Sequence, residues 1–111
     1  MIKRVFILSQ QSMFSKGIET LLSHEAGIEI MSTNTDLITS LECIKKDHPD
    51  IVIVNCDDPE NALSSVMLDI IRDRLGVCVI GLSLQDNQIS IFRGENKQVR
   101  QVEDLLEILH E

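Results

Sequence analysis

The chain is poor in aromatic residues and in clustered positive charge. It contains no Trp or Tyr and 3 Phe, and 18 acidic residues against 10 Lys and Arg give a formal net charge of -8. Clustered Lys and Arg supply much of a protein's affinity for nucleic acids and anionic membranes, and aromatic side chains stack on unpaired bases. No run of basic residues is longer than a pair such as Lys3–Arg4. The composition argues against direct binding of nucleic acid or of a membrane surface.

Long hydrophobic runs are missing as well. The N-terminal stretch MIKRVFILSQQ has an apolar run of four residues and no small-residue cleavage site. A signal peptide or a membrane-spanning helix needs a longer apolar segment. We therefore predict a cytoplasmic protein, and 111 residues predict a single domain over residues 1–111.

The sequence also lacks the usual spacings of metal ligands. The three cysteines form no CxxC pair, and no two histidines lie four residues apart. These spacings are common in metal and redox sites, so we expect reduced thiols, surface histidines, and no metal or cofactor. The residues concerned are Cys43, Cys56, Cys78, His24, His48 and His110.

What the sequence does contain is an alternation of two apolar patterns. Short β-branched and aliphatic runs are typical of strands buried on both faces, and apolar residues three and four apart are typical of amphipathic helices. Expected strands cover 4–8, 28–32, 50–55, 77–84 and 88–92, and expected helices cover 12–27, 35–48, 61–76 and 97–111. The alternation predicts an α/β fold with a flavodoxin-like, doubly wound sheet of strand order 2-1-3-4-5.

Helix ends have their own signals. Ser12 and Thr35 are expected N-caps, and Gly27 and Pro49 are expected stops. The last helix, 97–111, is expected to be amphipathic. Its apolar face would consist of Val99, Val102, Leu106 and Leu109.

One connection is too short for this pattern. Only Gln85, Asp86 and Asn87 separate the fourth and fifth expected strands. A parallel crossover needs a dozen or more residues, whereas Asp and Asn suit a tight hairpin because both tolerate the left-handed conformation. We therefore predict that the fourth helix is missing and that 88–92 runs antiparallel to 77–84 near the sheet edge. The alternative is an irregular loop at 88–92.

Three stretches resemble the receiver domain of bacterial response regulators, over roughly the first 84 residues. They are VFILSQQSMFSKGIETLL, HPDIVIVNCDDPE and VCVIGLS, and the subclass most similar is the one whose receivers precede a LuxR-type DNA-binding domain. The resemblance implies a role in two-component signal transduction. The alternative is that DIVIVN is an ordinary core strand of an unrelated α/β domain.

The resemblance also locates a phosphoacceptor site that has lost its carboxylates. In the family a carboxylate at the end of the third strand accepts a phosphoryl group, and Pro49 and Pro59 align that position with Asn55. An amide cannot form the acyl phosphate. Two further acidic positions that hold Mg²⁺ align with neutral residues, so Mg²⁺ is expected to bind poorly. The degenerate site positions are Ser9, Gln10, Asn55, Ser83 in place of the family's hydroxyl residue, and Arg93 as the nearest match to its Lys.

Three functions are compatible with this pattern. The first, which we favour, is a pseudo-receiver that is not an enzyme, works without phosphorylation, and acts through protein–protein contact, including a homodimer through residues 81–109. The second is the receiver part of a longer transcription regulator. The third is a small-ligand module that uses the polar strand ends at 9–11, 55–58 and 83–85, where Asp57 and Asp58 otherwise serve as turn residues.

Overall fold

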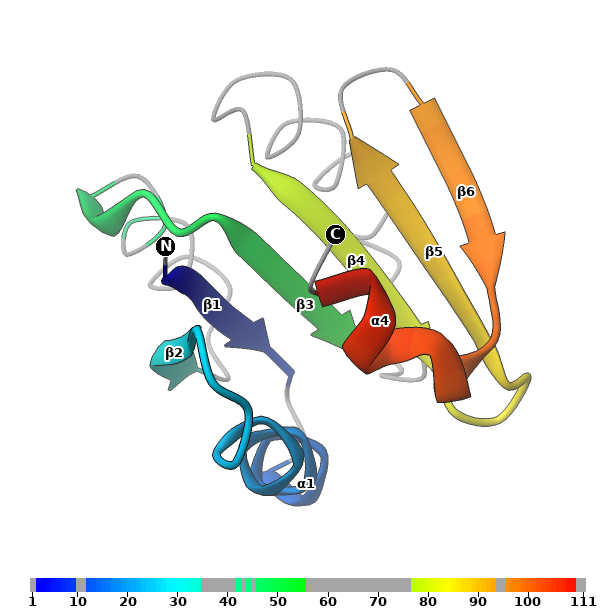
Figure 1. The fold of residues 1–111 in the computed structure, drawn as a ribbon, viewed down its shortest axis with the longest axis horizontal. Coiled ribbons are helices and arrows are strands. Elements are labelled where there is room, and N and C mark those ends of the chain that lie inside the picture. The colour runs from blue at the N-terminus through cyan, green and yellow to red at the C-terminus, as the bar shows by residue number, and fades with distance from the viewer. Residues whose placement is uncertain are drawn as a thin grey trace.

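A computed structural model describes residues 2–9, 12–34, 42, 44, 46–55, 77–93 and 96–109. The described chain has a mixed α/β fold built on one six-stranded sheet of order β2-β1-β3-β4-β5-β6 (Figure 1). The strands are β1 (Lys3–Leu8), β2 (Ile28–Asn34), β3 (Ile51–Asn55), β4 (Cys78–Ser83), β5 (Gln88–Arg93) and β6 (Asn96–Arg100). The helical elements with defined bounds are α1 (Ser12–Leu22), the 3-10 turn η2 (Val102–Asp104) and α4 (Leu105–Leu109).

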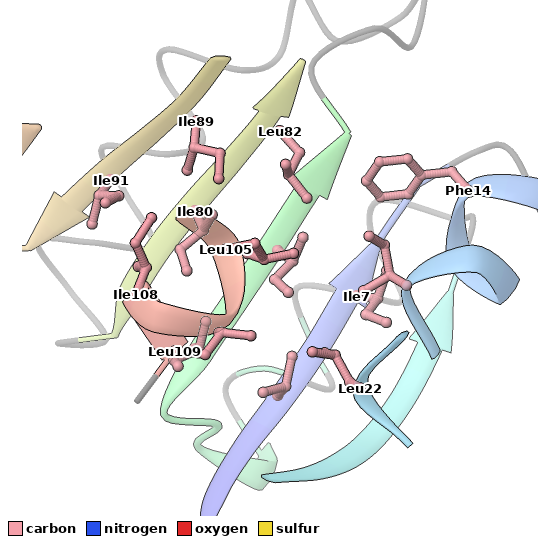
Figure 2. Packing of buried hydrophobic residues seen from close by; sticks show 14 residues of the cluster. Ile7, Phe14, Leu22, Ile80, Leu82, Ile89, Ile91, Leu105, Ile108 and Leu109 are labelled. Atoms are coloured by element: carbon pink, nitrogen blue, oxygen red, sulfur yellow. The ribbon is translucent and has the colours of Figure 1, made fainter. Parts of the chain in front are cut away.

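The first four strands are parallel, and the first five have the predicted order 2-1-3-4-5. Their side chains alternate between two apolar clusters because successive residues of a strand point to opposite faces. One cluster contains Ile7, Ile53 and Ile80 and packs against α1 and α4, as Figure 2 shows. The other contains Phe6 and Val52, with Ile44 from a helical segment. Both faces of the sheet are therefore covered, which explains the unbroken apolar runs.

The predicted hairpin is confirmed. β5 pairs antiparallel with β4, from Val79 opposite Phe92 to Ser83 opposite Gln88, and residues 84–87 form the turn. Asn87 takes a left-handed φ of 53°, the conformation that Asn tolerates better than most residues. The turn has no room for a helix, so the chain reverses direction here.

The predicted last helix is wrong over its first half. Residues Asn96–Arg100 form β6, antiparallel to β5, and the α-helix itself spans only Leu105–Leu109. The expected apolar face fails at Val99, which is 54% exposed, while Leu105 and Ile108 are buried. The physical reason is that β5 pairs with β4 along one side only, and the backbone N–H and C=O groups along its other side would otherwise be unpaired. Pairing with residues 96–100 satisfies these groups.

The helix ends largely follow the sequence signals. α1 begins at Ser12, but it ends at Leu22, five residues before the expected stop Gly27, so that part of the prediction is wrong. Gly27 has a left-handed φ of 82° and lies directly before β2. Residues 42, 44, 46 and 47 are helical, and this segment stops at His48, which has a φ of 49° and precedes Pro49. The expected helix 61–76 and the expected cap Thr35 lie outside the described residues.

The short α4 and the 3-10 turn before it are anchored to the strands β1 and β6. Lys3 in β1 donates from its Nζ to the carbonyl oxygen of Leu109, at 2.6 Å. Arg100 at the end of β6 forms ion pairs with Asp104, at 3.6 Å, and Glu107, at 3.4 Å. A cation at a helix C-terminus compensates carbonyls that have no partner within the helix. Among the described residues, no helix is long and apolar enough to cross a bilayer.

Candidate functional site

The polar centre of the molecule lies where the two central parallel strands end. Leu8 in β1 is in register with Val54 in β3, so Ser9 and Asn55 follow side by side at the carboxyl end of the sheet. The Nδ2 of Asn55 donates a hydrogen bond to the Oγ of Ser9, at 3.2 Å. Each residue is only 2% exposed. The sheet register alone therefore brings two of the predicted site residues into contact.

This pair is neutral and internally satisfied. Burying an ionised carboxylate is far more costly than burying an amide that has hydrogen-bond partners. Throughout the described residues, no buried side-chain nitrogen or oxygen lacks a partner. Because the Asn55–Ser9 pair is neutral and hydrogen-bonded, it can be buried, and it forms a polar link between β1 and β3. It presents neither an anionic nucleophile nor a general base.

Ser83 ends the neighbouring strand but serves a different purpose. Its Oγ accepts a hydrogen bond from the backbone N–H of Asp86, at 3.3 Å, and lies 3.4 Å from the Asp86 carboxylate, to which it donates. Val79 belongs to the cluster on the face opposite Ile53, and strand alternation places Ser83 on the side of Val79 and Asn55 on the side of Ile53. The hydroxyl therefore stabilises the β4–β5 turn and does not join the Asn55–Ser9 pair.

The structure does not bring Arg93 to this end of the sheet. Because β5 runs antiparallel, Phe92 pairs with Val79 near the start of β4, and Arg93 lies one residue beyond it. Five residues of strand at about 3.3 Å each put Arg93 roughly 16 Å from the carboxyl ends of β3 and β4. The sequence suggested Arg93 from its place after the fifth strand, and the reversed direction of that strand removes it from the site.

The remaining predicted positions, Gln10, Cys56, Asp57 and Asp58, lie outside the described residues. The described part of the site fits Mg²⁺ poorly. This ion prefers carboxylate oxygens in an octahedral array, and Ser9 and Asn55 supply one hydroxyl and one amide that already bind each other. No group of three His, Cys, Asp or Glu suited to a metal ion occurs in the part of the chain that the structure describes.

A second strand link was missed by the sequence reasoning. Asp50, directly before β3, accepts a hydrogen bond from the backbone N–H of Arg4, at 2.8 Å, and its own N–H donates to the Arg4 carbonyl, at 2.9 Å. The Arg4 guanidinium also donates to the carbonyl of Asp47. The available signal was the Pro49–Asp50 pair itself, because an Asp just before a strand is placed to bind backbone N–H groups.

Comparison with known proteins adds no relative. No protein-family model matches the sequence, and no curated protein matches it. The interpretation of the site therefore depends on its geometry and on the chemistry of its residues.

Proposed function

We propose that the chain is a flavodoxin-like, receiver-like signalling module of the cytoplasm that acts through protein–protein contact and is not controlled by phosphorylation. The observation that carries this proposal is the buried hydrogen bond from Asn55 to Ser9. In a receiver these positions would be the phosphoacceptor and a metal-holding carboxylate. Here they form a neutral hydrogen-bonded pair, which offers no carboxylate to accept a phosphoryl group or to bind a cation.

The arrangement of the strands and helices supports the receiver-like part. The first four strands are parallel with β1 and β3 at the centre, and the polar pair sits at their carboxyl ends, where doubly wound sheets place their sites. α1 and α4 lie on one face, and helical residue Ile44 contacts the other face. A module with this arrangement of strands and helices but without the carboxylates would keep the receiver-like fold and would not be controlled by phosphorylation.

Contact, including homodimerisation, is the output that we propose in place of phosphoryl transfer. Among the described residues, the region 81–109 differs most from a doubly wound pattern, because a hairpin, an edge strand and a five-residue helix replace alternating strands and helices. Edge strands are frequent sites of pairing with another chain. In this proposal the chain is not an enzyme, and it contacts neither nucleic acid nor membrane directly.

The test is the intact mass of the protein after incubation with acetyl phosphate and Mg²⁺, with a conventional receiver domain as positive control. We expect no added phosphoryl mass under conditions that fully modify the control. A stable adduct would overturn the proposal. In that case Asp57→Asn and Asp58→Asn variants would identify the acceptor.

A further inference from the structure

We draw no further inference here: the strongest candidate, the exposed stripe of Met13, Gly17 and Leu21 on the outer face of α1, is an apolar helix face, and nothing in the structure shows what covers it.

Discussion

The parallel half of the sheet and its antiparallel half are built differently. In the parallel half, β3 is buried at all five positions, IVIVN, because helical segments cover both faces. In the antiparallel half, β5 buries Ile89 and Ile91 on one face, while Ser90 and Phe92 on the other are only half buried. The next strand, β6, is more exposed still at Val99. Burial thus falls from the centre of the sheet toward one edge.

The difference shows how much of the structure depends on the length of one loop, the turn between β4 and β5. In a sheet of parallel strands the carboxyl ends meet, so Ser9 and Asn55 come together without any loop carrying them. A four-residue turn after β4 cannot hold a crossover, and it sends β5 back toward the other end. As a result Arg93 lies far from the site, and Ser83 is drawn into the turn. The short connection disconnects the antiparallel half from the polar centre.

The largest expected difference between the halves is in the cost of removing a side chain. Ile53→Ala in β3 deletes a side chain with no exposure from the centre of the core, and we expect a loss of about 2–5 kcal/mol in the free energy of unfolding. Val99→Ala in β6 should change it by less than about 0.5 kcal/mol. Urea denaturation of dilute samples measures both. Similar costs for the two variants would mean that the halves are equally packed.

The next effect concerns the polar centre. Asn55→Asp introduces a carboxylate at a position that is 2% exposed, and we expect it to lower the free energy of unfolding by about 1–3 kcal/mol at neutral pH. It should still take up no phosphoryl group from acetyl phosphate, because Ser9 and Gln10 supply no carboxylate for Mg²⁺. Urea denaturation and intact mass provide the two measurements.

Asn55→Ser serves as the neutral control for this variant. It replaces the amide with a smaller neutral hydroxyl and should cost less stability than Asn55→Asp does. Phosphorylation of Asn55→Asp would show that one substitution restores the switch. The lack of charge on Ser9 and Gln10 would then not be the reason that the parent protein takes up no phosphoryl group.

The parallel half was the part that could be predicted from sequence. Its strands are short apolar runs, and their order followed from alternation with helices, as β3 illustrates. The hairpin was also predictable, because the three polar residues 85–87 left no alternative length. The antiparallel edge was not, since Val99, Val102, Leu106 and Leu109 satisfy a helical period just as well as a strand followed by a helix.

Residues 96–100 form a strand because the backbone groups of β5 need hydrogen-bond partners. This is a tertiary effect, and the local pattern of apolar residues does not indicate it. A signal was present in Gly94–Glu95, the two residues between the paired Arg93 and Asn96, because Gly is favoured first in two-residue hairpin loops. For the site, the sequence placed Ser9 and Asn55 at neighbouring strand ends. Their hydrogen bond, and the use of Ser83 in a turn, depended on side-chain direction.

Lys3 joins the two halves, and its removal tests how strongly they are coupled. Lys3→Met keeps most of the apolar stem but loses the hydrogen bond to the Leu109 carbonyl, which we expect to cost about 1–2 kcal/mol. Lys16→Met, at an exposed position on α1, is the matched control and should be nearly neutral. Hydrogen exchange should show the loss first in Leu105–Leu109. Equal loss of protection throughout the sheet would mean that both halves unfold as one unit.

The smallest effect should be a gain, and it lies in the parallel half. Gly17 is exposed in the middle of α1, and a Cβ added there would meet no atom within 4 Å. Glycine inside a helix costs about 0.5–1 kcal/mol relative to alanine because the unfolded chain has more freedom to lose. We therefore expect Gly17→Ala to raise the free energy of unfolding by that amount in urea denaturation. If hydrogen exchange slows in β1 and β3 but not in β5 and β6, the antiparallel half opens separately. If it slows equally in both, the two halves share one unfolding transition despite their different construction.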